Sequence, residues 1–250
     1  MNRTSAVSNI FAPPQLGQEQ AHVWHVNLER VSADEQRWEN LLSTDERERA
    51  ARFRFPRDRR RYTATRALLR ALLGGYLETE PESLNFRYTE HGKPALAGAN
   101  EGSNLQFNVS HSDGVALFGL TLGRTIGVDV ERVRHDFDVV TIAKRFFSAT
   151  EQRTFAALPA AQHHRAFFDC WTRKEAYVKA LGEGLSHPLH QFDVSLAPGE
   201  PARIVATRPD PKEAVQWTMT APDVGTGYAA AVIVKAPKLE IKCWELPKLG

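Results

Sequence analysis

The clearest pattern of apolar and polar positions lies between Ile126 and Glu131, where apolar side chains at 126, 128 and 130 alternate with Gly127, Asp129 and Glu131. A period of two predicts a β-strand with one buried face. The opposite face then presents Asp129 and Glu131 on the same side. Because neighbouring like charges repel, this pair indicates a cation between the carboxylates, and a hard divalent ion is the natural candidate.

A second pattern, with apolar residues recurring at steps of three and four, predicts a helix from His164 to Leu181 that ends at two nearby glycines. Lys174 and Glu175 fall inside its apolar arc, and Lys179 lies one turn beyond Glu175 on the same side. In one interpretation these side chains extend from a core face along their apolar stems. In the other, Glu175 completes the metal site and the lysines contact an anion that the metal also binds.

The rest of the chain alternates between strand-like and helix-like segments. Strands are expected at residues 22–28, 86–89, 107–112, 115–122, 192–196, 203–207, 215–220 and 228–234. Helices are expected at residues 60–76 and 137–147, and the capping-box sequences Ser43 to Glu46 and Ser148 to Glu151 open two more. With 250 residues, the chain is long enough to bury a substantial core as one large domain or two small ones.

Composition places the chain among globular proteins, since 42% of its residues are hydrophobic and 25% are charged. No apolar run approaches the roughly twenty residues of a membrane span, and the first residues lack the hydrophobic core of a signal peptide. The sequence therefore predicts a cytoplasmic protein. Cys170 and Cys243 lie far apart, and four histidines between 163 and 190 lack a matching cysteine set, so neither a disulfide framework nor a zinc site is expected.

The distribution of charge changes this picture between Arg47 and Arg70. Ten arginines in this segment are balanced by only two acidic residues, Glu48 and Asp58, which gives a local net charge of +8 in a chain whose total is +2. Such segregation predicts an anionic partner, either a phosphate-rich ligand or a nucleic acid. The alternative is a solvated helix face, because arginine stems also cover apolar surface.

Two short segments carry side chains suited to phosphate. His91-Gly92-Lys93-Pro94 predicts a turn in which glycine permits close backbone approach and Lys93 meets a phosphate. Serines on either side of His111 end an apolar strand with donors for phosphate oxygens. A serine nucleophile is the competing interpretation, but no Gly-x-Ser-x-Gly sequence supports it. The chain also lacks a phosphate-binding Gly-x-x-x-x-Gly-Lys-Ser/Thr loop and a dinucleotide fingerprint.

Five segments stand together in the order and spacing typical of one enzyme family. They are His91 to Pro94, Phe107 to Ser112, Ile126 to Glu131, Lys144 to Ser148, and Trp171 to Ala176. In these segments the chain resembles the Sfp-type 4′-phosphopantetheinyl transferases. The resemblance extends from about Ser43 to Leu196 and more loosely to Val234. Each segment is weak by itself, but the five together are highly specific.

The resemblance implies an α+β fold of two similar halves related by a pseudo-two-fold axis, with the ligand site between them. We expect a loose leader at residues 1–20, an N-terminal half at 21–124 and a C-terminal half at 125–250 that carries the metal site. The implied reaction transfers 4′-phosphopantetheine from coenzyme A to a serine of an apo acyl or peptidyl carrier protein. It uses Mg²⁺ on the pyrophosphate and releases adenosine 3′,5′-bisphosphate. The leader has no clear counterpart in the family.

The resemblance also assigns roles to individual residues. Asp129, Glu131 and Glu175 match metal ligands, in agreement with the patterns above. Lys174 and Lys179 match residues near the pyrophosphate, Arg49, Ser110 and His111 match positions near the 3′-phosphate, and Arg60, Arg61, Gly92, Lys93 and Pro94 match positions around the adenosine. Glu46 is acidic where some relatives carry a basic residue, which changes the expected 3′-phosphate contacts.

Attack of a serine hydroxyl on a phosphoryl group needs charge neutralisation on the pyrophosphate, which magnesium and the lysines would supply. It also needs a base: Glu175 is the expected one and Glu151 the second candidate, with Lys179 as a further catalytic residue. One alternative is another magnesium-dependent phosphoryl or nucleotidyl transferase with a different donor. The other, a nucleic-acid-binding module built on the arginine segment, leaves the carboxylates unexplained. We therefore expect a monomeric enzyme without nucleic-acid or membrane partners.

Overall fold

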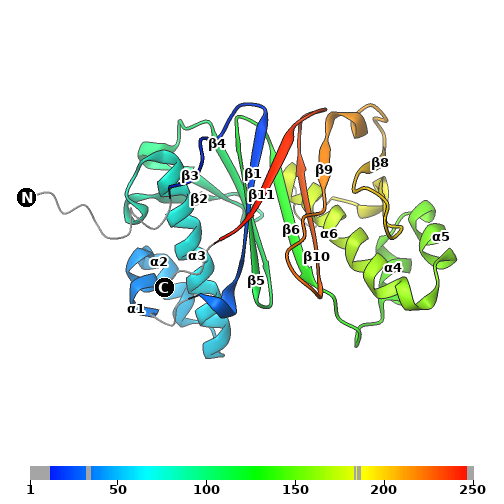
Figure 1. Cartoon of the computed structure of the whole chain (residues 1–250), viewed down its shortest axis with the longest axis horizontal. Helices are drawn as coiled ribbons and strands as arrows, with labels where there is room; N and C mark the ends of the chain where they lie inside the picture. The colour runs from blue at the N-terminus through cyan, green and yellow to red at the C-terminus, as the bar shows by residue number, and fades with distance from the viewer. Residues whose placement is uncertain (1–11, 32–34, 183, 185–186, 247–250) are drawn as a thin grey trace, which may run out of the picture.

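The computed structural model describes residues 12–31, 35–182, 184 and 187–246. Figure 1 shows two lobes side by side, each built from a sheet and a long helix. Residues 1–11, which make up most of the expected leader at 1–20, lie outside the described residues. In the described part of the chain, no helix is both long and apolar enough to cross a membrane.

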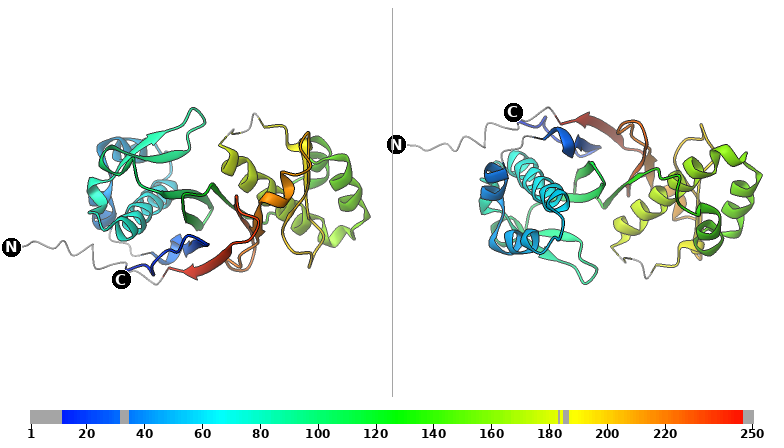
Figure 2. Two further views of the ribbon diagram at one scale, coloured as in Figure 1. Left: turned by 90° about the horizontal axis from the view of Figure 1, so that it is seen from above. Right: turned by 90° about the horizontal axis from the view of Figure 1, so that it is seen from below.

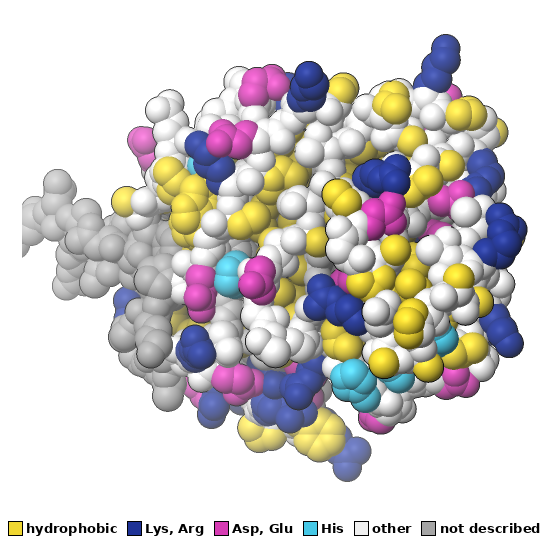
Figure 3. All heavy atoms as spheres, turned by 45° about the vertical axis from the view of Figure 1, so that its right-hand side comes forward, with side chains coloured by type: hydrophobic (Ala, Val, Ile, Leu, Met, Phe, Trp, Pro, Cys, Tyr) yellow, Lys and Arg dark blue, Asp and Glu magenta, His cyan; other side chains and the backbone are white. Residues whose placement is uncertain are grey.

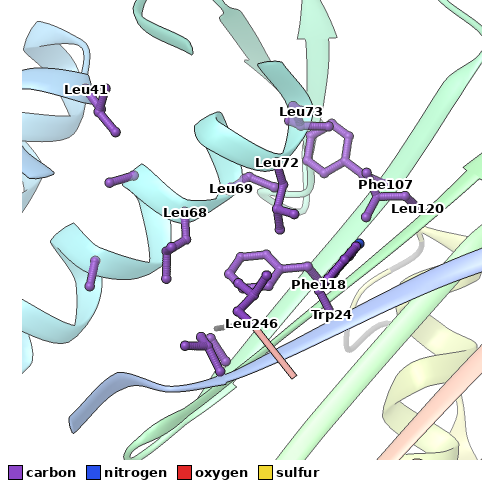
Figure 4. Packing of buried hydrophobic residues seen from close by; sticks show 14 of the residues in the cluster. Trp24, Leu41, Leu68, Leu69, Leu72, Leu73, Phe107, Phe118, Leu120 and Leu246 are labelled. Atoms are coloured by element: carbon purple, nitrogen blue, oxygen red, sulfur yellow. The ribbon is translucent and has the colours of Figure 1, made fainter. Parts of the chain in front are cut away.

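The N-terminal half packs its helices against a sheet. Its elements are β1 (Gln20–Asn27), α1 (Glu35–Leu41), α2 (Thr44–Ala51), α3 (Pro56–Leu77), β2 (Asn85–Tyr88), β3 (Pro94–Ala97), β4 (Leu105–Ser112) and β5 (Val115–Leu122). The strand order is β11-β1-β5-β4, and every pair except β11 with β1 is antiparallel. Leu68 and Leu72 of α3 share one buried core with Phe118 of β5 (Figure 4). This core holds the sheet that carries β4 at its edge.

The C-terminal half has a smaller sheet with the order β6-β10-β9, in which both pairs are antiparallel. Its elements are β6 (Ile126–Arg132), α4 (Val139–Phe146), α5 (Ala149–Ala157), α6 (His163–Leu181), β7 (Phe192–Val194), β8 (Ile204–Thr207), β9 (Thr218–Thr220) and β10 (Tyr228–Val234), followed by β11 (Glu240–Glu245). The long helix α6 packs on β6 and β10. The predicted helix and strand that carry the charged residues are therefore neighbours.

The two halves repeat one order of elements. In each, a strand is followed by two short helices, a long helix, a two-stranded hairpin and two further strands. The sheets match as well, because β1-β5-β4 corresponds to β6-β10-β9 and α3 corresponds to α6. This repetition confirms an α+β fold of two similar halves.

The C-terminus departs from the expected division at residues 124 and 125. β11 pairs in parallel with β1, and Figure 2 shows it reaching back from the C-terminal lobe to lie beside that strand. Trp244 of β11 stacks on Trp24 of β1 with 4.8 Å between ring centroids. The last described strand therefore belongs to the N-terminal sheet. The sequence pattern did not predict this strand, nor β3 or α1.

The two predicted capping boxes are present at the starts of α2 and α5. In each, the glutamate accepts a hydrogen bond from the N-cap backbone N–H, at 3.0 Å for Glu46 and 2.8 Å for Glu151. Both glutamates are buried, and each also binds cations of the long helix in its half, namely Arg66 and Arg70 for Glu46 and Lys174 for Glu151. In both halves, therefore, a buried glutamate at the start of a short helix binds a cation of the long helix and holds the two helices together.

Two glycines permit the close packing that assembles the site. A Cβ on Gly127 of β6 would lie 2.0 Å from the carbonyl oxygen of Ala176 on α6, so only glycine lets the helix lie directly on this strand. A Cβ on Gly119 of β5 would lie 2.6 Å from the Val128 side chain, where the two sheets meet. These contacts set the height of α6 above β6 and bring the two halves together.

Candidate functional site

The predicted strand is β6, and its two faces divide as the alternation requires. Its apolar residues, including Val128 and Val130, are fully buried in a core between the two sheets. Asp129 lies on the face covered by α6, with only 3% of its surface exposed, and Glu131 follows two residues later. Because α6 covers this face, both carboxylates come close to the charged residues of that helix.

Glu175 of α6 joins the two acids of β6. Burial is the main cause that raises the pKa of Glu175 to about 6, and Asp129 and Glu131 raise it further, whereas Lys179 lowers it. Burial also raises the pKa of Glu131, again with a contribution from Asp129. The three carboxylates therefore lie near enough to repel one another, and the cluster would accept a cation.

Lys179 is a cation that already contacts this cluster. Its Nζ donates to Asp129 Oδ1 at 2.6 Å and to Ser110 Oγ at 2.9 Å, and the Ser110 hydroxyl donates to the same Asp129 oxygen at 2.9 Å. The Lys179 side chain keeps 31% of its surface exposed, so it retains room to move. Ser110 is drawn into the acidic cluster, which corrects the expectation that its hydroxyl faces a 3′-phosphate.

The remaining carboxylate oxygens show whether the cluster suits a metal ion. Within the part of the chain that the structure describes, Asp129 Oδ2 and Glu175 Oε1 are buried and have no hydrogen-bond partner. Such unpartnered oxygens are rare, and they are the hard donors that Mg²⁺ prefers. Among the same residues, no group of three His, Cys, Asp or Glu side chains stands in coordinating geometry. The donors fit a divalent ion, provided that Lys179 yields its place on Asp129.

Lys174 and Glu151 lie outside this cluster, contrary to expectation. Lys174 is completely buried, and its Nζ contacts Glu151 Oε2 at 2.9 Å and the carbonyl oxygens of Leu189 and Phe192, each at 2.7 Å. Adjacent helical residues point about 100° apart, so Lys174 and Glu175 leave α6 on different sides. Lys174 therefore cannot meet a pyrophosphate beside Glu175. Glu151 is only 2% exposed and is a structural acid, which removes it as a base.

Three cationic side chains lie near His111, which is close to the end of β4. Desolvation lowers the pKa of His111, and the nearby cations Lys179, Arg61 and Arg49 lower it further. These cations therefore lie within electrostatic reach of the imidazole and extend the positive region away from Asp129. Arg60 and Arg61 were expected around the adenosine. Arg60 instead forms an exposed ion pair with Glu35 of α1 at 2.9 Å, and Arg61 pairs with Glu29 at 2.7 Å while it lies within reach of His111.

A cleft of about 180 Å³ separates the halves beside Lys179. The turn His91 to Pro94 lines one side, and Asn108, Lys179 and Gly182 contribute to the rest. Gly92 has a φ of +76°, which residues with a side chain rarely adopt, so this turn needs glycine for its shape. Lys93 crosses the cleft and donates to the Lys179 carbonyl oxygen at 2.7 Å, and burial lowers the pKa of Lys93 to about 8.

Comparison with known proteins places this chain in a family. A model of the 4′-phosphopantetheinyl transferase superfamily matches residues 125–233, and a model of the 4′-phosphopantetheinyl transferase N-terminal region matches residues 30–119. The 4′-phosphopantetheinyl transferase HetI of Nostoc sp. is 38% identical over 234 residues, which cover 93% of this chain and 95% of HetI. The 4′-phosphopantetheinyl transferase Sfp of Bacillus subtilis is 28% identical and covers 70% of this chain and 76% of its own.

Among solved structures, the holo-[acyl-carrier-protein] synthase of Thermotoga maritima aligns with a TM-score of 0.36 and 22% identity, over 48% of this chain and 65% of that one. On the strength of the family models and HetI, the chain belongs to the 4′-phosphopantetheinyl transferase family. Such enzymes transfer 4′-phosphopantetheine from coenzyme A to a serine of a carrier protein. The expected family, enzyme class and transfer reaction are thereby confirmed.

Two further residues of β4 contact the strand that carries the acids: Asn108, for which the sequence predicted no role, and Ser112, which the sequence predicted as a donor to phosphate oxygens and which binds Glu131 instead. Asn108 and Ser112 flank Ser110 on β4, and all three side chains contact β6. The signal that could have found them is the spacing of polar residues at 108, 110 and 112, because alternate residues of a strand point the same way. Recognising it required knowing that β6 lies beside β4.

Proposed function

We propose that this chain carries out the family reaction with Mg²⁺ as cofactor and with Asp129, Glu131 and Glu175 as the metal ligands. One observation carries the proposal. Two buried oxygens, Asp129 Oδ2 and Glu175 Oε1, lack hydrogen-bond partners among the described residues, and the Asp129 carboxylate raises the pKa of Glu175. When bound, the ion would neutralise charge on the pyrophosphate of coenzyme A.

The surrounding cations suit the other parts of the coenzyme. Lys179 contacts the acids and lines the cleft, so its ammonium would be available to a pyrophosphate oxygen. Gly92, Lys93 and Pro94 line the cleft, which we assign to the adenosine. The positive region that Arg49 and Arg61 form beside His111 is assigned to the 3′-phosphate. Lys174, Ser110, Arg60 and Glu151 take no direct part in binding the coenzyme.

In the reaction, the serine hydroxyl oxygen attacks the phosphorus that bears the pantetheine group. The bond from this phosphorus to the bridging oxygen breaks, and adenosine 3′,5′-bisphosphate leaves. Lys179 offsets the charge that develops on the leaving phosphate. Glu175 accepts the serine proton. The hydroxyl proton thus ends on the Glu175 carboxyl group.

Mass spectrometry of several purified apo acyl and peptidyl carrier proteins tests this function. Each is incubated with the enzyme and coenzyme A, with either Mg²⁺ or EDTA. We expect one phosphopantetheine group on at least one carrier protein, with Mg²⁺ only. The absence of modification on every carrier would contradict the assigned acceptor. Full modification in EDTA would instead contradict the metal, and modification with ATP in place of coenzyme A would favour a transferase with another donor.

A further inference from the structure

The two halves meet at β4 and β6, and side chains form the junction. In the described part of the chain, β6 pairs with β10 and β4 pairs with β5, while no backbone ladder joins β4 to β6. Asn108 Oδ1 instead accepts a hydrogen bond from the Val128 N–H at 2.8 Å, and Ser110 Oγ donates to Asp129 at 2.9 Å. Polar side chains of the N-terminal half therefore satisfy groups on the strand that carries the acids.

Ser112 continues this row at its outer end. Its hydroxyl donates to Glu131 Oε2 at 2.7 Å and accepts a hydrogen bond from the Arg132 N–H at 3.1 Å. Two simultaneous bonds leave the hydroxyl one orientation, and they connect the Glu131 carboxylate to the backbone of its own strand. The bond to Ser112 favours the charged form of Glu131 and opposes the effect of burial on its pKa.

We infer that Ser112 is a positioning residue for the Glu131 carboxylate, supplied by the half of the protein that contributes none of the three acids. This inference rests on the proposed function, in which Glu131 is a metal ligand. Glu131 is only partly buried, so without Ser112 its side chain is free to turn toward solvent. Hydrogen-bond partners of metal ligands orient them, and losing one typically costs about 10- to 100-fold in metal affinity.

Removal of the hydroxyl tests this role through metal binding, with no turnover. Mg²⁺ is titrated calorimetrically into the enzyme with saturating coenzyme A and no carrier protein. We expect Ser112→Ala to weaken Mg²⁺ binding at least tenfold and Ser112→Thr, which keeps the hydroxyl, to restore most of the affinity. In kinetics, Ser112→Ala should raise the Mg²⁺ concentration needed for half-maximal rate while preserving most of the rate at saturation. If Ser112→Ala does not fold, Ser112→Cys takes its place.

Thr121→Val is the matched control, because Thr121 of β5 also makes a 2.7 Å hydroxyl hydrogen bond, to the Arg124 carbonyl oxygen, away from the acids. It should lower the melting temperature without changing Mg²⁺ affinity. Mg²⁺ binding by Ser112→Ala within twofold of wild type would overturn the inference. Glu131→Gln, titrated in parallel, distinguishes an error in the metal ligands from an error in the role of Ser112. If Glu131→Gln also binds Mg²⁺ normally, the proposed metal ligands are wrong. If only Glu131→Gln weakens Mg²⁺ binding, the proposed metal ligands are supported and the inferred role of Ser112 is wrong.

Discussion

The ammonium of Lys179 lies 2.6 Å from Oδ1 of Asp129, a proposed metal ligand. A side-chain cation therefore occupies part of the position that a metal ion would take. Mg²⁺ bound at Asp129 Oδ2, which has no hydrogen-bond partner among the described residues, would repel the Lys179 ammonium. A pyrophosphate in the cleft would offer this ammonium a new partner. Because each ligand favours the same displaced position of Lys179, binding of coenzyme A and of Mg²⁺ should be coupled, and the coupling must be reciprocal.

Lys179→Met tests this coupling. Without coenzyme A, the variant should bind Mg²⁺ more tightly than wild type, by about tenfold, because no internal cation competes for Asp129. Coenzyme A should enhance Mg²⁺ binding less in the variant than in wild type, and turnover should fall steeply because the pyrophosphate loses a partner. Calorimetric titration of Mg²⁺ with and without coenzyme A measures both effects, with the exposed Lys212→Met as control. Unchanged coupling in Lys179→Met would contradict the exchange.

The two candidate bases should respond in opposite ways to loss of charge. Glu175→Gln keeps the shape of a side chain that ionises with difficulty, so the melting temperature should hold or rise while turnover falls at saturating Mg²⁺ and coenzyme A. Glu151→Gln leaves buried Lys174 without its counter-charge and should destabilise the fold by about 3–5 kcal/mol. Turnover per folded molecule should be retained. The opposite pattern, with stable but inactive Glu151→Gln, would restore Glu151 as the base.

The raised pKa of Glu175 predicts a change of stability with pH in the metal-free enzyme. The pKa rises from 4.5 to about 6 on folding, so between these values the folded state binds more protons than the unfolded state. Stability should therefore fall as pH increases through this window, by on the order of 1 kcal/mol after solvent screening. Urea unfolding of wild type and Glu175→Gln in EDTA between pH 4.5 and 7 isolates the effect. Parallel curves for the two proteins would reject the shift.

Lys93 predicts a pH dependence of coenzyme binding on the alkaline side. Burial lowers its pKa to about 8, so the ammonium that lines the cleft loses its proton above that pH. The affinity for coenzyme A should then decline between pH 7.5 and about 9.5 in wild type, because the anionic ligand loses a positive partner. Lys93→Arg keeps its charge over this range and should show a flatter profile. Fluorescence or calorimetric binding curves at several pH values provide the test, and superimposable profiles would exclude Lys93 from the coenzyme site.

Gly127→Ala should move Asp129 and Glu131 of β6 away from Glu175 of α6. The added Cβ would lie 2.0 Å from the Ala176 carbonyl oxygen and 2.6 Å from the Ala180 N, both backbone atoms, so the helix must shift. We expect a loss of several kcal/mol in the free energy of unfolding together with weaker Mg²⁺ binding. Gly123→Ala is the control, because a Cβ there meets no atom within 4 Å, although its φ of +64° adds local strain. Equal stability of the two variants would argue against this close approach.

The mixed character of the outer surface explains why charge alone could not locate the ligand. Figure 3 shows basic and acidic side chains interspersed with hydrophobic ones over one face of the molecule. The arginine segment illustrates the problem, since Arg66 and Arg70 bind the buried Glu46 while Arg59 and Arg60 pair with acids of α1. Arg49 and Arg61 lie near His111, but Arg61 also pairs with Glu29 at 2.7 Å and with Asp113 at 3.4 Å. The local charge of +8 therefore overstates the positive charge available to a ligand.

Monomeric state, cytoplasmic location and the lack of nucleic-acid binding stay predictions.

The sequence by itself determined the local secondary structure and the family motifs. The alternation at residues 126–131 determined β6, the capping boxes determined the starts of α2 and α5, and the joint motifs determined the family. These features depend on neighbouring residues, whose periods and hydrogen bonds are set by local geometry. Only the tertiary structure decided that Lys174 is a buried partner of Glu151, that Lys179 and Ser110 share Asp129, and that Ser112 reaches Glu131 across the two halves. The physical reason is that a helical pattern gives the direction of a side chain about its own axis, whereas its partner depends on which surface packs against that direction.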